Sequence, residues 1–110
     1  MGRILKMTLS KAQDEVDEWA NQYKVPYWTP HEILARLTEE VGELAREINH
    51  THGPKKKKTP TEGSTIKEEM GDVLFTLICL ANSQKIDLDE CFQKAMAKCY
   101  GRDKNRFEKK

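Results

Sequence analysis

The sequence predicts an all-α protein built from about four helices. Apolar residues recur at helical spacing along nearly the whole chain, and no segment alternates between apolar and polar residues with period two. Several of the apolar stretches also begin at a Thr or Asp with Glu three residues later, which is a typical helix start. The chain has 110 residues. This length predicts one domain over residues 1–110, arranged as a bundle-like unit.

Each expected helix has a start signal. The first begins near a possible capping box of Ser10 and Gln13. The second has the clearest signal, because Thr29 suits the N-cap, Pro30 suits the first helical position, and Glu32 closes a capping box. The last two each begin at a Thr or Asp that is followed three residues later by Glu. The predicted helices are residues 9–23, 30–49, 65–84 and 87–103.

Two segments are expected to be flexible. Residues 50–63 contain two prolines, two glycines and the run Lys55–Lys58, which is typical of a solvated, mobile loop. The lysine run also suits collection of polyphosphate or a localisation signal, although a solvated segment is the simpler interpretation. Residues 1–8 are the second segment.

The third predicted helix indicates an oligomer. Residues 73–81 are apolar almost all round the helix, and such a helix needs cover on most sides. Three neighbouring helices in a short chain do not supply that cover. We therefore expect a homodimer or a homotetramer.

Composition excludes several classes of protein. The net charge of +1 argues against stable nucleic-acid binding. No apolar stretch approaches the length of a membrane span, and the first residues lack the apolar run of a signal peptide. The three cysteines contain no C-x-x-C pair, so we expect reduced thiols in a cytoplasmic protein.

Two pairs of acidic residues carry the functional argument. Glu40 and Glu43 are three residues apart at the edge of the apolar stripe of the second helix. Glu69 and Asp72 repeat this spacing within a narrow polar strip on the third helix. Either pair alone is also compatible with an ordinary solvated surface, but the two together in one short chain favour a site.

Facing acidic pairs cannot all stay ionised without a compensating charge. A hard divalent cation supplies it, and oxygen ligands suit Mg²⁺, with Mn²⁺ as a substitute. Magnesium commonly completes its coordination with phosphate oxygens, which indicates a nucleotide or another phosphate ester. A di-iron centre is the weaker alternative, because such bundles take a Glu-x-x-His motif from each of two helices and the sequence has this spacing only once, at Glu47 and His50.

At these residues the sequence resembles the MazG-like nucleotide pyrophosphohydrolases of the all-α NTP pyrophosphatase group. Their signature is E-E-x-x-E followed, after a variable loop, by E-x-x-D. Here the first motif occupies residues 39–43 and the second occupies residues 69–72. The resemblance extends over about residues 9–107 and is greatest to short stand-alone bacterial members.

The resemblance implies hydrolysis of a nucleoside triphosphate to the monophosphate and pyrophosphate, by attack of water on the α-phosphorus. Glu39 would orient or deprotonate the water, and Glu40 would share that role. The implied metal ligands are Glu40, Glu43, Glu69 and Asp72.

Residues that bind the rest of the nucleotide are harder to predict. Family members carry phosphate-contacting Lys and Arg near the C-terminus, and Lys98, Arg102 and Arg106 suit that role, although a solvated basic helix face is the alternative. Trp28 is a candidate for stacking on the base, although aromatic side chains more often belong to a core.

Three functions remain open. A house-cleaning (d)NTP pyrophosphohydrolase is the first expectation, and a specialist similar to dUTPase or dCTPase is the alternative among enzymes. A non-enzymatic helical module that senses nucleotides or binds partners is the alternative outside enzymes. The sequence does not indicate the preferred base or sugar.

Overall fold

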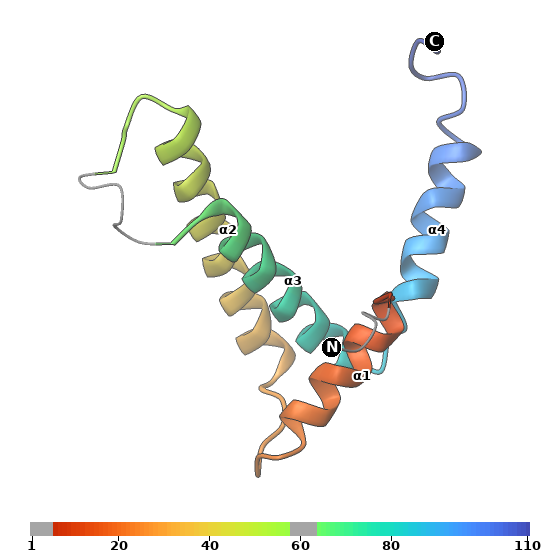
Figure 1. The fold of residues 1–110 in the computed structure, drawn as a ribbon. Helices are drawn as coiled ribbons and strands as arrows, with labels where there is room; N and C mark the ends of the chain where they lie inside the picture. Colours follow the sequence, from red (N-terminus) through yellow and green to blue (C-terminus); the bar gives the residue numbers. More distant parts are fainter. Residues whose placement is uncertain (1–5, 58–63) are drawn as a thin grey trace.

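The structure, a computed structural model, describes residues 6–57 and 64–110. Four helices and no strand occur in these ranges: α1 (Leu9–Ala20), α2 (Pro30–His52), α3 (Ile66–Ser83) and α4 (Leu88–Tyr100) (Figure 1). The predicted all-α class is therefore confirmed. The segments expected to be flexible lie partly outside the described residues, at 1–5 and 58–63.

Local capping determines where α2 and α3 begin. The side chain of Thr29 accepts a hydrogen bond from the backbone N–H of Glu32, whose carboxylate accepts one from the N–H of Thr29, so the predicted capping box is present. Thr65 caps α3 by accepting from the N–H of Glu68 at 3.1 Å. These contacts satisfy backbone donors that a helix otherwise leaves unpaired.

Other predicted boundaries were wrong. Thr8, not Ser10, caps α1, because the hydroxyl of Thr8 accepts from the N–H of Lys11. α1 ends at Ala20, α2 continues to His52, and α4 ends at Tyr100. The extension of α2 follows from the position of its breakers, because the chain first leaves the helix at Gly53, directly before Pro54.

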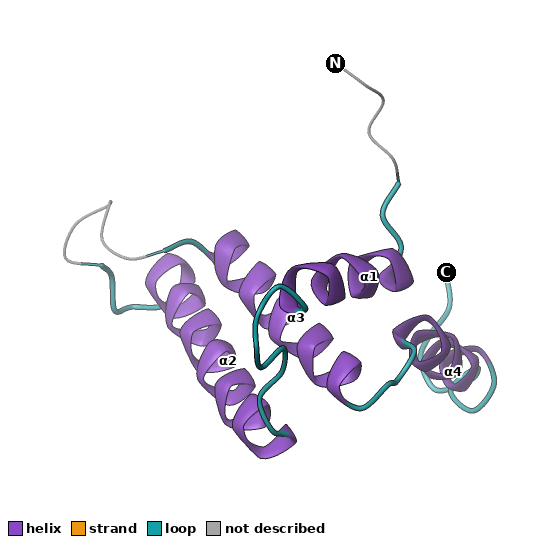
Figure 2. Ribbon diagram, turned by 90° about the horizontal axis from the view of Figure 1, so that it is seen from below, coloured by secondary structure: helices purple, strands orange, loops and turns teal. Residues whose placement is uncertain are grey.

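The main packing unit is the pair formed by α2 and α3, which lie side by side in both ribbon views (Figures 1 and 2). α1 packs against α3, and α4 makes its main contacts with α1. The buried apolar residues of the described chain are few: Ala20, Ile33, Ile78 and Ala81. Three acidic residues of α2 and α3 are buried beside this small core: Glu40, Glu47 and Glu69.

α3 keeps much of its apolar surface exposed. Leu74, Phe75 and Leu77 are 47%, 41% and 39% exposed. These exposed fractions agree with the expectation that one chain does not bury all of the apolar surface of this helix. α4 diverges from the α2–α3 pair, and its C-terminal end points away from both helices (Figure 1).

A polar network holds the junction between α3 and α4 against α1. The side-chain amide of Gln13 donates to Asn82 Oδ1 at 2.9 Å and to the backbone oxygen of Ile86 at 2.7 Å. Its carbonyl oxygen accepts from the N–H of Leu88, also at 2.9 Å. One buried residue on α1 therefore determines how the chain enters α4.

No helix among the described residues is long and apolar enough to cross a membrane.

Candidate metal centre

Packing of α2 against α3 brings three carboxylates together. Glu40 and Glu43 extend from α2 and Glu69 extends from α3, and one oxygen of each lies within 4.8 Å of those of the other two. The three-residue spacing on α2 places Glu40 and Glu43 on neighbouring positions of one face. The structure thus unites three of the four predicted metal ligands.

Two of these carboxylates are buried and only half satisfied. Glu40 is 3% exposed and Glu69 is 6% exposed. Arg36 contacts Glu40 Oε1 at 2.7 Å, and the Ser64 hydroxyl donates to Glu69 Oε1. The second oxygen of each, Oε2, is buried without a hydrogen-bond partner in the described chain. Burying an unpaired carboxylate oxygen is costly, so both atoms indicate a missing positive partner.

Glu43 shows the electrostatic consequence of this arrangement. Its side chain is more exposed than the other two, yet its pKa is raised. The largest cause is the negative charge of Glu40, followed by partial loss of hydration and by the charge of Glu69. The cluster therefore lacks enough positive charge, and a cation would relieve the repulsion.

The donor set fits a hard divalent cation. All three clustered groups are carboxylates, the ligand type that Mg²⁺ and Mn²⁺ prefer. None of the three cysteines belongs to the cluster, and all three are free thiols. The chemistry of the ligands therefore suits a hard divalent cation better than zinc or an iron–sulfur cluster.

Two further predicted residues lie beside the three. Asp72 lines a pocket together with Glu40, but it is exposed and does not belong to the group whose oxygens approach one another. Glu39 is exposed on α2 next to Glu40. Their assignments as metal ligand and as base stay predictions.

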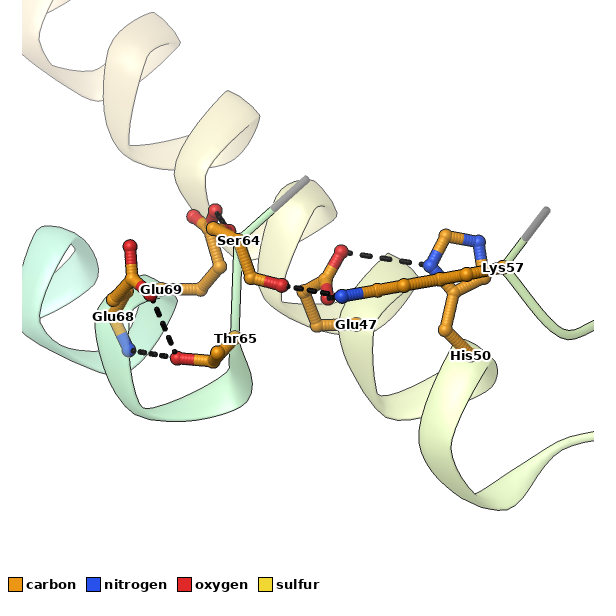
Figure 3. Close-up of polar contacts among 7 residues, drawn as sticks. All are labelled: Glu47, His50, Lys57, Ser64, Thr65, Glu68 and Glu69. Carbon is orange, nitrogen blue, oxygen red and sulfur yellow. Dashed lines mark hydrogen bonds and ion pairs between the residues drawn. The ribbon is translucent and has the colours of Figure 1, made fainter. Parts of the chain in front are cut away.

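The side chains of Glu47 and Lys57 form an ion pair one turn from Glu43 (Figure 3). Lys57 Nζ lies 2.7 Å from Glu47 Oε1, and His50 Nδ1 lies 3.5 Å from Glu47 Oε2. The hydrogen bond from Lys57 lowers the pKa of Glu47, despite the burial of that carboxylate, and the positive charge of Lys57 adds to the effect. Glu47 is thus paired with Lys57, whereas the neighbouring carboxylates dominate the surroundings of Glu43 and only the charge of Arg36 acts in the opposite sense.

An aromatic pocket of about 680 Å³ adjoins the carboxylates. Trp28 lines it, and its role in base stacking stays a prediction; Trp19 also lines it and contacts Phe75, with ring centroids 5.7 Å apart. The polar end of the pocket contains Arg36, Glu40 and Asp72. Its size is typical of a small-molecule site.

A more polar pocket of about 770 Å³ beside α1 contains none of the clustered carboxylates among its lining residues.

The predicted phosphate-binding residues lie elsewhere in the chain. Lys98 is exposed in the last turn of α4, and Arg102 and Arg106 follow that helix. Both arginines contact Asp103 Oδ1, at 3.2 and 3.4 Å. Because α4 points away from α2 and α3, one chain does not bring these groups to its own carboxylates (Figure 1).

Three residues near the centre, Arg36, Glu47 and Ser64, were assigned no role from the sequence, and Lys57 was considered only as part of the run Lys55–Lys58. Arg36 precedes Glu40 by four residues, a spacing that predicts a helical ion pair. Glu47 continues the spacing of Glu40 and Glu43 along α2, and this regularity was the available signal. Nothing in the sequence distinguishes Lys57 from its neighbouring lysines.

The chain is similar to known proteins over most of its length. Residues 28–107 match the model of the MazG nucleotide pyrophosphohydrolase domain. YpjD from Bacillus subtilis strain 168 is 48% identical over 103 residues, which cover 94% of this chain and 93% of YpjD. The crystal structure of B. subtilis YpjD aligns with a TM-score of 0.77, covering 86% of this chain and 97% of that one. A second crystal structure, of a Bacillus-conserved MazG protein described as a nucleotide pyrophosphohydrolase, aligns at 45% identity and a TM-score of 0.74, covering 86% and 92%.

Proposed function

Because the chain belongs to the MazG nucleotide pyrophosphohydrolase family, we propose that it hydrolyses nucleoside triphosphates to monophosphate and pyrophosphate in a Mg²⁺-dependent reaction. The observation that carries this proposal is the half-satisfied carboxylate cluster. Glu40 and Glu69 each have one buried oxygen at the interface of α2 and α3 that has no hydrogen-bond partner among residues 6–57 and 64–110. An all-carboxylate cluster of this kind suits a hard cation and, through it, a phosphate chain.

Glu40, Glu43, Glu69 and Asp72 would hold the cation. When bound, Mg²⁺ supplies neutralisation of phosphate charge and acidifies a water molecule. Asp72 enters this set because it borders the same pocket as Glu40. The short side chain of Asp72 would need the cation, or a ligand of the cation, to draw it toward the other three.

Glu39 is the proposed acceptor of the proton from the attacking water. The water oxygen would bond to the α-phosphorus, its proton would pass to the carboxylate, and the bond to the pyrophosphate oxygen would break. Arg36 holds Glu40 Oε1 in an ion pair, which leaves Oε2 of Glu40 to orient the water and bind metal. Glu39 is exposed and has no such partner among the described residues.

The aromatic pocket is the proposed base site. Its wall is continuous with Glu40 and Asp72, so a base stacked on Trp28 would place its phosphates toward the carboxylates. Stacking is tolerant of base identity. The proposal therefore includes a house-cleaning enzyme that acts on several (d)NTPs.

We infer a homodimer or homotetramer in which a second copy supplies Lys98, Arg102 and Arg106 to the phosphates. Two observations support association. Leu34, Val41 and Ile48 form an exposed apolar stripe on α2, at 52%, 48% and 44% exposure, and the apolar residues of α3 are exposed as well. Gly42 and Gly71 lie inside these helices, where an added methyl group would meet nothing within 4 Å. Glycine costs about 1 kcal/mol in a helix interior, and packing within this chain does not explain that cost.

The test is release of pyrophosphate from a panel of canonical and modified nucleotides, with Mg²⁺ or with a chelator. We expect turnover only with the metal, and loss of turnover in Glu43→Gln with the circular dichroism spectrum unchanged. Turnover restricted to dUTP or dCTP would identify a specialist. Nucleotide binding without turnover of any member of the panel would contradict the proposal and favour a sensing module.

A further inference from the structure

We propose that Lys57 is a positioning residue for the metal ligand Glu69, and that it acts through Ser64. The proposal rests on the function proposed above, because it concerns the orientation of one metal ligand. Two hydrogen bonds that meet at Ser64 link Lys57 to Glu69, one to the backbone oxygen of Ser64 and one from its hydroxyl (Figure 3). No part of this series involves a nucleotide.

Lys57 bridges α2 and the segment that leads into α3. Its ammonium group donates to the backbone oxygen of Ser64 at 2.6 Å and contacts Glu47 Oε1 on α2 at 2.7 Å. The side chain of Lys57 is 19% exposed, and that of Glu47 is 7% exposed. A charge-assisted contact of this length and burial holds both partners in place. Lys57 therefore determines where the backbone of Ser64 lies relative to α2.

Ser64 in turn determines which oxygen of Glu69 is available to a cation. Its hydroxyl donates to Glu69 Oε1, while Oε2 stays buried and without a partner among the described residues. A hydrogen bond to one oxygen fixes the side-chain torsion and so aims the other oxygen. Groups that orient metal ligands in this way commonly change metal affinity on the order of 10- to 100-fold.

The charge of Lys57 is already matched in this arrangement. Glu47 is the nearest carboxylate, and it is ionised because Lys57 lowers its pKa. A lysine that contacts a buried carboxylate and a carbonyl has a structural environment, in contrast to the exposed Lys98 of α4. This difference separates a positioning role from direct contact with the substrate phosphates.

Mn²⁺ affinity measured by electron paramagnetic resonance, on the full chain without nucleotide, tests the proposal. Lys57→Met removes the bridge, and Lys56→Met is the matched control, because Lys56 contacts only the backbone oxygen of Thr51 among the described residues, at 3.3 Å. We expect the dissociation constant for Mn²⁺ to rise on the order of 10-fold or more in Lys57→Met, and to stay unchanged in Lys56→Met.

Ser64→Ala tests the second step with a smaller change. It removes the hydroxyl that contacts Glu69 but keeps the backbone oxygen that accepts from Lys57. We expect weaker Mn²⁺ binding in Ser64→Ala, with little additional loss in the double variant with Lys57→Met, because both substitutions break the same series. Circular dichroism verifies that each variant remains helical.

Three results would overturn the proposal. Equal Mn²⁺ affinity in Lys57→Met and Lys56→Met is the first, and fully additive losses in the double variant are the second. The third is a raised KM for nucleotide with unchanged Mn²⁺ affinity, which would make Lys57 a phosphate contact. If the wild type itself binds Mn²⁺ no more tightly than Glu69→Gln, the proposed metal centre fails, and this outcome is distinct from the other three.

Discussion

Glu43 and Glu47 lie one turn apart on α2, yet their electrostatic environments are opposite. Glu47 contacts Lys57 at 2.7 Å and has a lowered pKa, whereas Glu43 faces Glu40 and Glu69 and has a raised one. The same residue type on the same helix thus contacts a lysine in one case and faces two other carboxylates in the other. This contrast yields the first two predictions.

Glu43→Gln and Glu47→Gln should have different effects. Glu43→Gln removes a proposed metal ligand, so hydrolysis should fall by at least 100-fold while the melting temperature of the metal-free protein rises, because repulsion among the carboxylates is relieved. Glu47→Gln should lower the melting temperature, because it leaves Lys57 without its carboxylate. Thermal melts with a chelator, together with pyrophosphate release, measure both effects. Equal stability and equal activity in the two variants would contradict the assignment.

The two pKa shifts also predict how stability depends on pH. The lowered pKa of Glu47 means that its stabilisation is present above its usual pKa of about 4.5 and is lost as pH falls through the lower folded value. The raised pKa of Glu43 acts in the opposite sense: its contribution is complete below about 4.5 and is lost as pH rises through the folded value.

Urea unfolding of the metal-free protein between about pH 3 and 7, a range that spans the usual carboxyl pKa values, tests this predicted pH dependence. Glu43→Gln should exceed the wild type in stability near neutrality and approach it in acid. Glu47→Gln should be less stable than the wild type near neutrality and approach it below the usual carboxyl pKa. A stability difference that does not change with pH would contradict the argument.

Much of the fold follows from local signals in the sequence. Thr29, Glu32 and Thr65 act within a few residues of themselves, so their caps are readable without knowledge of the fold. Spacing alone placed Glu40 and Glu43 beside a buried face, and it also predicted that Glu69 would face them. The helix extension to His52 was missed because no residue before Gly53 distinguishes a helix from a loop.

The missed contacts join residues that are distant in sequence. Gln13 contacts the α3–α4 junction across about seventy positions, and no local pattern marks a glutamine for that role. Lys57 was one lysine in a run, and only the packing of the loop onto α2 selects it for Glu47. The direction of α4 was unpredictable for the same reason, since it depends on the contacts of Gln13.

Gln13→Ala should destabilise the protein by about 1–3 kcal/mol, because it removes three part-buried hydrogen bonds, to Asn82, Ile86 and Leu88. Gln22→Ala is the matched control, since its exposed amide contacts only the backbone oxygen of Trp19 among the described residues. Urea unfolding followed by circular dichroism measures the difference. Similar midpoints for the two variants would show that the network contributes little.

Trp28→Ala should raise the KM for nucleotides on the order of tenfold, because a stacked base is worth about 1–3 kcal/mol. The Mg²⁺ dependence should not change, because Trp28 lines the aromatic part of the pocket and is no metal ligand. Trp28→Phe should retain most of the affinity, since it keeps an aromatic face. An unchanged KM in Trp28→Ala for every nucleotide hydrolysed would remove Trp28 from the base site.

A mixture of two inactive variants tests whether the site is shared between chains. Arg106 follows α4 and Glu43 lies on α2, and these helices diverge within one chain. If a second copy supplies Arg106, then Glu43→Gln and Arg106→Ala should each be inactive alone, but a mixed dimer contains one site with both native residues. Random exchange of subunits should then restore about a quarter of wild-type turnover in a two-fold dimer.

The control is a mixture of Glu43→Gln with Glu69→Gln. Both residues belong to the cluster built by one chain, so every site in that mixture lacks a ligand and no turnover should return. Unfolding and refolding the variants together ensures exchange, and pyrophosphate release reports the outcome. If Arg106→Ala also fails to complement Glu43→Gln, its side chain does not act on a partner's carboxylates, and the arginine must serve its own chain or none.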